Sequence, residues 1–347
     1  MDTVVERSFT AYGVTLESGE KLSELTLAFE TYGGLAADGR NAILVTHGFT
    51  SSGHAAGKYA PSDDEPGWWD GLIGPGKAID TDRYFVVSSN MLGSSYGSTA
   101  PASVNPATGK PCGPDFPAIT LGDIVHAQRL LLDSLGVRHL VAVAGPSFGG
   151  YQAFQWAVTY PTYMDGIVPA VTAPRGSGGE AEVTSLLERF ATDPNWHGGW
   201  HYDRGGISAT MTDLRLEMLK RYGRAEILAA TIADPAARDA RIRAMAEAWA
   251  GEFDPNSMVV LRRAASRFDA ERDFSRVCAR VLYVLSRTDR LFPPSLAPAV
   301  MDRLRAAGVE AAYVEIDTNF GHSASGADWE KWAPALGEFL ATLGRAR

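Results

Sequence analysis

A serine between an apolar strand pattern and a helix pattern is the feature that most constrains this chain. The sequence Gly145-Pro146-Ser147-Phe148-Gly149 follows the apolar run 139–145 and precedes a helical pattern over 150–160. Glycines around a serine allow a strand to turn sharply into a helix, and the turn presents the hydroxyl. Free N–H groups at the start of that helix would face an oxyanion forming there. The pattern predicts a nucleophilic Ser147; the alternative is a glycine-rich turn whose serine only caps the helix.

Short apolar runs without alternation recur along the chain, and such runs are typical of parallel strands that are covered on both faces. Two earlier segments, 8–19 and 22–33, alternate apolar and polar residues and predict an antiparallel hairpin. Helical patterns lie between or after the runs, so we expect an α/β fold: a mostly parallel sheet with helices on both faces. The apolar runs are 41–49, 83–90, 139–145, 166–173, 279–286 and 311–317, and the main helical patterns are 120–135, 150–160, 295–307 and 327–344.

One long segment interrupts this alternation. Residues 174–275 contain helix-like runs and no strand pattern, and they begin with the glycine-rich sequence PRGSGGE. We therefore predict a helical lid inserted between two strands of the sheet. The expected division is a first core part over 1–173, the lid over 174–275 and a second core part over 276–347.

A nucleophilic serine needs a histidine base, which in this fold class lies after the serine and the acid in the chain. His322 is the candidate, because it lies in a loop directly after the late strand 311–317. The rivals His197 and His201 fall in the lid. Their H-x₃-H spacing suits a metal, but no neighbouring cysteine or carboxylate completes a site, so we expect no metal.

Two aspartates could orient the histidine. Asp289 follows the strand 279–286, and Asp317 ends the strand that precedes His322. The carboxyl ends of parallel strands meet at one edge of the sheet. Asp289 is favoured, because it would approach the imidazole from a neighbouring strand end.

The oxyanion hole of such an enzyme takes one N–H from the residue after the nucleophile and one from the loop after an earlier strand. These positions are Phe148 and Phe49, the latter in Thr46-His47-Gly48-Phe49-Thr50. Because His47 shares this turn, we interpret it as structural and not as a second base.

Charge and composition exclude several classes of function. The net charge of −9 argues against a nucleic-acid partner, since such partners are bound by clustered Lys and Arg. The first residues lack the basic and apolar segments of a secretory signal, and no apolar run is long enough for a membrane partner. With only two cysteines, the composition favours a reducing compartment, and we expect the cytoplasm.

Longer stretches resemble the homoserine O-acetyltransferase family of α/β-hydrolase-fold enzymes. They are Gly67–Thr81 (GWWDGLIGPGKAIDT), Asn90–Gly93 (NMLG), Tyr96–Thr99 (YGST) and Asn105–Lys110 (NPATGK). The resemblance implies the α/β-hydrolase fold, with Ser147 as nucleophile, Asp289 as acid and His322 as base. It also implies a helical lid through which two copies would form a homodimer.

The sequence departs from this family at positions that matter for the substrate. After the catalytic Gly-His, the family typically has an aspartate that holds the homoserine amine, and Ser323 stands here. The family's lid has an arginine for the substrate carboxylate in a G-L-x-x-A-R segment, and the corresponding stretch 206–211 carries Thr210-Met211 in place of that Ala-Arg step. Each lost charge-assisted hydrogen bond costs roughly 1.5–3 kcal/mol.

These departures favour a serine ester hydrolase acting on short, acetyl-type esters through an acyl-enzyme. Phe320, Ser323 and Thr210 are then expected to border the substrate, and the reaction needs no cofactor. One alternative is an O-acetyltransferase that takes acetyl-CoA as acyl donor and homoserine or serine as acceptor. Another is a catalytically silent binding protein of the same fold.

Overall fold

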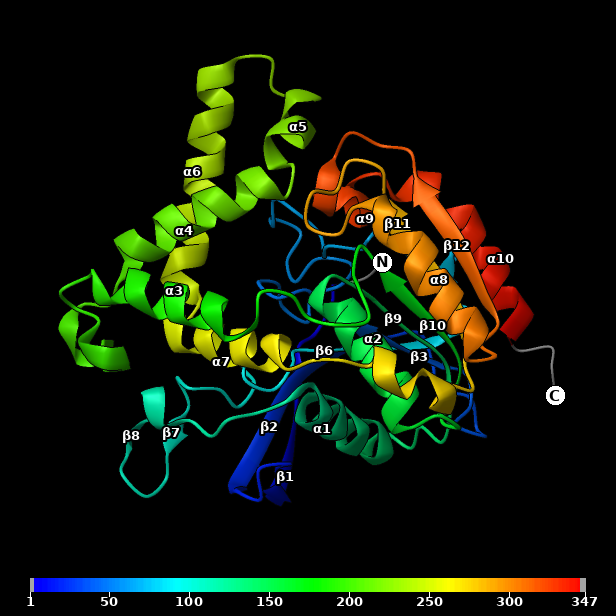
Figure 1. The fold of residues 1–347 in the computed structure, drawn as a ribbon, viewed down its shortest axis with the longest axis horizontal. Helices are drawn as coiled ribbons and strands as arrows, with labels where there is room; N and C mark the ends of the chain where they lie inside the picture. Colours follow the sequence, from blue (N-terminus) through cyan, green and yellow to red (C-terminus); the bar gives the residue numbers. More distant parts are fainter. Residues whose placement is uncertain (1–2, 344–347) are drawn as a thin grey trace.

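An eight-stranded sheet lies at the centre of the computed structural model, which describes residues 3–343 (Figure 1). The strand order is β1-β2-β6-β3-β9-β10-β11-β12. The pairs β1/β2 and β2/β6 are antiparallel, and the other neighbours are parallel, which confirms the predicted hairpin and α/β class. The strands are β1 (Arg7–Thr15), β2 (Lys21–Tyr32), β3 (Ala42–Thr46), β6 (Phe85–Ser89), β9 (Leu140–Pro146), β10 (Met164–Ala170), β11 (Arg280–Ser286) and β12 (Ala311–Ile316).

Helices cover both faces of this sheet, which explains why its central strands are apolar throughout. Every residue of β3 is buried. Leu44 belongs to the apolar cluster shared with α1, α2 and α8, whereas Ile43 and Val45 belong to the cluster shared with α10. The bounds of these helices are α1 (Leu121–Ser134), α2 (Phe148–Thr159), α8 (Ala297–Ala306) and α10 (Ala333–Leu343).

The chain between β10 and β11 is helical, and Figure 1 shows much of it standing beyond one edge of the sheet. An isolated antiparallel bridge between Arg175 and Asp269 joins the two ends of this segment. Its division from the core at residues 174 and 275 stays a prediction. The helices are α3 (Gly179–Ala191), α4 (Ser208–Arg221), α5 (Arg224–Ala229), α6 (Pro235–Glu252) and α7 (Pro255–Ser266). None of the helices within residues 3–343 is long and apolar enough to cross a membrane.

The structure differs from the sequence prediction near its C-terminal end. The helix predicted over 327–344 is interrupted: α9 (Ala324–Ala327) ends at Asp328, and α10 begins at Ala333. The buried Trp332 indole N–H donates to the Ser325 carbonyl over 2.9 Å, which holds the intervening chain in a turn. Residue 344 lies outside the described residues. Four two-residue strands were too short for periodicity to predict: β4 (Ile73–Gly74), β5 (Ile79–Asp80), β7 (Val104–Asn105) and β8 (Lys110–Pro111).

Candidate active site

Ser147 lies at the sharp turn between β9 and α2, as the glycine pattern predicts. Its backbone has φ 56° and ψ −119°, a region that residues other than glycine rarely adopt. The Ser147 N–H donates to the Ala170 carbonyl over 2.9 Å, and the Thr172 hydroxyl donates to the Ser147 carbonyl over 2.7 Å. A Cβ atom on Gly145 or Gly149 would overlap atoms of Thr46. The turn therefore requires both glycines and is fixed by neighbouring strands.

Two backbone N–H groups are available beside this serine. They belong to Phe49 and Phe148, whose rings stack with centroids 5.9 Å apart. No group in residues 3–343 accepts a hydrogen bond from the backbone N–H of either residue. Buried N–H groups are rarely left without a partner. The free pair, at the two predicted positions, is suited to an oxyanion bound between them.

His47 fixes the loop that carries Phe49. Its Nε2 accepts a hydrogen bond from the Met91 N–H over 3.0 Å, and its Nδ1 lies 2.9 Å from the Gly48 carbonyl. Complete burial lowers the pKa of His47 to about 4, so the ring stays neutral near pH 7. With both ring nitrogens engaged, His47 orders the backbone and is not available as a base.

The structure brings His322 and Asp289 together. His322 Nδ1 lies 2.8 Å from Asp289 Oδ2, and the Asp289 side chain is fully buried. Asp289 Oδ1 also accepts the N–H groups of Leu291 and Phe292, at 2.8 and 3.2 Å. A carboxylate in this position holds the histidine with its proton on Nδ1, which leaves the Nε2 lone pair free to accept one.

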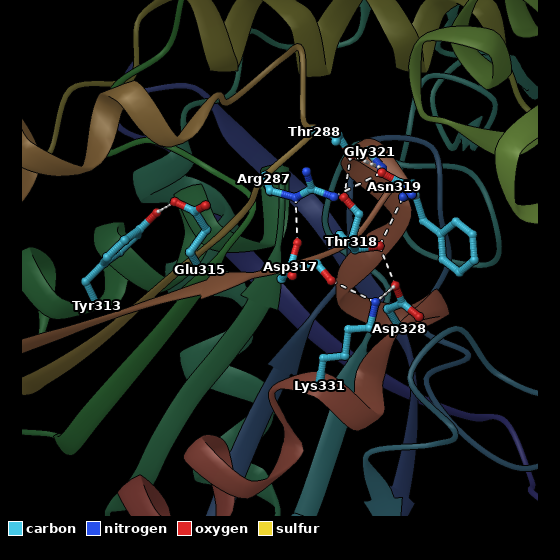
Figure 2. Close-up of polar contacts among 11 residues, drawn as sticks. Arg287, Thr288, Tyr313, Glu315, Asp317, Thr318, Asn319, Gly321, Asp328 and Lys331 are labelled. Atoms are coloured by element: carbon cyan, nitrogen blue, oxygen red, sulfur yellow. Dashed lines mark hydrogen bonds and ion pairs between the residues drawn. The ribbon is translucent and has the colours of Figure 1, made fainter.

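Asp317, the alternative acid, lies elsewhere. Its side chain is 84% exposed and pairs with Arg287 Nε at 2.6 Å (Figure 2). The Lys331 ammonium donates to the Asp317 carbonyl over 2.7 Å. Asp317 therefore stabilises the outer surface of this loop and makes no hydrogen bond to His322.

Ser147 and His322 border the same cavity, of about 680 Å³, between the sheet edge and the helices α4 to α6. Ser147 also borders a second cavity of about 500 Å³, beneath α3, α4 and α7. Phe49 and Tyr222 border both cavities as well. A serine at the meeting point of two cavities could receive a group from one side and pass it to a molecule on the other.

Sequence reasoning missed Arg215, which projects from α4 into the first cavity. Its Nη1 donates to the Thr50 hydroxyl over 2.7 Å, and its guanidinium lies 4.8 Å from the Trp249 ring centroid. Its Nε is buried without a partner, and no carboxylate in residues 3–343 pairs with it. Burial accordingly lowers the pKa of Arg215 from its ordinary value. An unpaired guanidinium in such a site attracts an anion.

Of the three predicted substrate-binding residues, one borders a cavity at Ser147 and two do not. Ser323 borders the first cavity. Thr210 does not: it lies on the first turn of α4, and its hydroxyl donates to Asp193 over 2.8 Å. Phe320 also borders neither cavity, because its ring packs against the apolar cluster around Trp69 and Trp332. The positions of Thr210 and Phe320 in the chain could not show how either side chain is turned.

The rival histidines take no part in this site. His201 Nε2 lies 3.1 Å from Asp254 Oδ1 in a buried pair at the base of the lid, and His197 is at the start of the short turn His197–Gly199. Neither borders the two cavities that contain Ser147.

Comparison with known proteins agrees with this architecture. Residues 41–326 match the family described as the alpha/beta hydrolase fold. A homoserine O-acetyltransferase of Symbiobacterium thermophilum is 40% identical over 353 residues, covering 95% of this chain and 92% of that protein. The chain belongs to the homoserine O-acetyltransferase family of α/β-hydrolase-fold enzymes.

Two solved structures are similar over nearly the whole chain. Homoserine O-acetyltransferase from Bacillus anthracis matches with a TM-score of 0.88 and 30% identity, covering 98% of each chain. Esterase E22 matches with a TM-score of 0.89 and 29% identity, covering 97% of this chain and 100% of that chain.

The expectation of an ester hydrolase is therefore wrong. The relative at 40% identity is a transferase, while the similar esterase is 29% identical. The physical argument for a hydrolase was the loss of two charges from the substrate cavity, an aspartate at the position of Ser323 and an arginine in the stretch that carries Thr210. Arg215 borders that cavity, so a guanidinium is present there and this half of the argument does not hold.

Proposed function

We propose that this enzyme transfers the acetyl group of acetyl-CoA to the side-chain hydroxyl of homoserine, with Ser147, His322 and Asp289 as the catalytic residues. Two observations support the proposal. The unpaired guanidinium of Arg215 borders the same cavity as Ser147 and His322. A homoserine O-acetyltransferase is 40% identical over nearly the full chain.

In the first half-reaction, the Ser147 hydroxyl attacks the thioester carbonyl while His322 Nε2 takes its proton. The N–H groups of Phe49 and Phe148 stabilise the oxyanion of the tetrahedral intermediate. The C–S bond then breaks, His322 returns the proton to the departing sulfur, and an acetyl-Ser147 ester remains. Asp289 stabilises the imidazolium that forms in between.

In the second half-reaction, the hydroxyl of homoserine attacks the acetyl ester and His322 takes the proton of that hydroxyl. The bond to Ser147 Oγ breaks, His322 protonates the serine, and O-acetylhomoserine leaves. The Arg215 guanidinium binds the carboxylate of the acceptor, since a charge-assisted hydrogen bond in a half-buried site is stronger than the hydrogen bonds that the two groups make to water. This contact holds the acceptor hydroxyl near the acyl-enzyme.

The second cavity suits the acyl donor. Its lining is apolar near Ser147, with Phe148, Met258 and Phe292, and arginines border it further out. Arg189 and Arg262 pair with Glu217 and Glu182, whereas Arg221 forms no ion pair with a carboxylate in residues 3–343. A guanidinium of this kind attracts the phosphates of a coenzyme A thioester.

The test measures acetyl transfer from acetyl-CoA to homoserine, with the CoA thiol and O-acetylhomoserine followed separately. The acceptor 3-aminopropan-1-ol, which is homoserine without its carboxylate, reports on Arg215. We expect the wild type to prefer homoserine strongly, and Arg215→Lys to reduce that preference by about tenfold or more. Arg243→Lys, a change at an exposed position of α6, is the control. If acetyl-CoA is cleaved at the same rate with and without homoserine, and the only acetyl product is acetate, the proposal is contradicted.

A homodimer formed through the lid and a cytoplasmic location stay predictions. The first comes from the family resemblance and the second from composition.

A further inference from the structure

The proposed function leaves the ammonium group of the acceptor without an obvious partner. Family members hold this group with an aspartate directly after the catalytic histidine, and Ser323 stands at that position. A serine hydroxyl carries no charge to balance an ammonium. Another group in the same cavity must do so if a free amino acid is the acceptor.

A buried carboxylate lies behind one wall of this cavity. The Glu30 side chain on β2 is only 1% exposed. Glu30 Oε2 accepts the Tyr32 hydroxyl, and Glu30 Oε1 accepts the Tyr59 hydroxyl over 2.5 Å. Burial and the nearby Glu30 charge raise the pKa of both phenols, so both stay protonated and donate. Both oxygens of the Glu30 carboxyl therefore accept a hydrogen bond from a phenol.

His54 connects this carboxylate with the cavity. Its Nδ1 lies 3.0 Å from Glu30 Oε1, and its ring stacks on Tyr59 with centroids 4.1 Å apart. The residue borders the same cavity as Ser147 and Arg215. Because the Glu30 carboxylate holds the Nδ1 proton, Nε2 carries a lone pair, and no group in residues 3–343 donates to it. The pair of Glu30 and His54 thus has the same hydrogen-bond arrangement as the pair of Asp289 and His322, at another wall of the cavity.

No lysine or arginine neutralises Glu30. Among the described residues, His54 is its only ion-pair partner. Two further carboxylates, Glu6 and Asp63, act on Tyr59 of the cluster. The pKa of Glu6 is itself raised by its burial and by Glu30. The cluster of Glu30, Tyr32, His54 and Tyr59 thus places a net negative charge beneath the cavity wall. A cation that docks on His54 would balance it.

Other carboxylates of the cavity are less suited. Glu65 is 56% exposed and already pairs with Arg224 and Arg241, at 3.4 and 3.2 Å. Glu252 borders the cavity from the end of α6 and is exposed to solvent, where an ion pair contributes little.

We propose that His54, held by Glu30, binds the primary ammonium group of the acceptor through Nε2. This inference rests on the proposed function and assigns the substrate class: an amino acid with its ammonium on His54 and its carboxylate on Arg215. A hydroxy acid of the same length would lack the first contact.

The test compares homoserine with 4-hydroxybutanoate, which keeps the hydroxyl and carboxylate and lacks the amine. We expect kcat/KM of the wild type to be higher for homoserine than for 4-hydroxybutanoate. His54→Ala should reduce the ratio of these two kcat/KM values by about tenfold to a hundredfold. The burst of CoA release that reports acetyl-Ser147 formation should keep its amplitude. Glu30→Gln should reduce the ratio in the same direction. His126→Ala, at an exposed histidine of α1, should leave it unchanged.

Three outcomes separate this inference from the proposed function. Equal kcat/KM for the two acceptors in the wild type would overturn the ammonium site while acetyl transfer itself stands. If the homoserine to 4-hydroxybutanoate ratio falls in Glu252→Gln and not in His54→Ala, the ammonium group binds Glu252, and the assignment to His54 is overturned. A burst of CoA release without acetylation of either acceptor would instead contradict the proposed function. If His54→Ala unfolds, His54→Phe, which preserves the stacking on Tyr59, gives the same comparison.

Discussion

The Thr288 hydroxyl accepts a hydrogen bond from the Gly321 backbone N–H over 3.1 Å and joins two loops of the active site (Figure 2). One loop carries Asp289 and the other carries His322, each directly after the bonded residue. The same hydroxyl donates to the Thr318 carbonyl over 3.1 Å. A neutral side chain thus fixes the separation between the acid and the base of the proposed catalytic group.

Thr288→Val should therefore lower kcat by about tenfold without changing the affinity for acetyl-CoA. Valine has the same shape but leaves the Gly321 N–H and the Thr318 carbonyl without their partner, which costs about 1–3 kcal/mol of unfolding free energy as well. Steady-state kinetics and urea unfolding measure the two effects. Thr288→Ser, which restores the hydroxyl, should recover most of kcat; a serine variant as slow as valine would show that the hydrogen bonds are not the cause.

Asp289→Asn should reduce kcat by about 10⁴-fold, because an amide can hold His322 in the wrong tautomer. Asp317→Asn should leave kcat within about twofold, since this side chain is exposed and pairs only with Arg287 among the described side chains. The two variants form a matched pair one strand apart, and both are measured by CoA release. Greater loss in the Asp317 variant would reverse the choice of acid.

The sequence predicted those parts of the site that depend on local pattern. The turn at Ser147 follows from glycine spacing between a strand and a helix, and Asp289 and His322 follow from their positions just after strands. Strand ends of a parallel sheet converge on one edge whatever the details of packing. These residues could therefore be chosen before the fold was known.

Arg215, Thr210 and Glu30 could not be assigned in the same way. Arg215 and Thr210 lie on one helix, and only the packing of that helix over the cavity decides which side chain enters it. Glu30 and His54 are 24 residues apart. They meet because β2, which carries Glu30, lies beside β6, and β6 lies beside β3, which the chain leaves shortly before His54. Arg215 on α4 and Tyr222, the residue directly after α4, are two helical turns apart in the sequence. This spacing places both residues on one side of the helix and is a signal that sequence reasoning could have used.

Ser147→Gly should inactivate the enzyme and stabilise its fold. Ser147 adopts φ 56°, and holding a residue other than glycine in such a region costs of order 1–3 kcal/mol. Glycine adopts this region readily, so we expect the free energy of unfolding to rise by about 1 kcal/mol, less the greater chain entropy of glycine when unfolded. Ser147→Ala is the control, because it removes the hydroxyl and keeps the strain. Equal stability of the two variants would indicate that the turn is not strained.

The stability of the fold should decrease in mild acid because of His47. Its pKa is lowered from 6.5 to about 4 by burial, so the unfolded chain binds a proton on this ring below pH 6.5 while the folded protein does not. The unfolding free energy should fall between pH 6.5 and pH 4, by about 3 kcal/mol in total, and this contribution should be constant below pH 4. Urea unfolding across this range measures it, with His47→Gln as the reference, since glutamine does not titrate. The difference in unfolding free energy between the two proteins should narrow as the pH falls. If the difference in unfolding free energy stays the same from pH 6.5 to pH 4, His47 takes up a proton in the folded protein as readily as in the unfolded chain. The loop carrying Phe49 would then be held by a contact other than the neutral His47 ring.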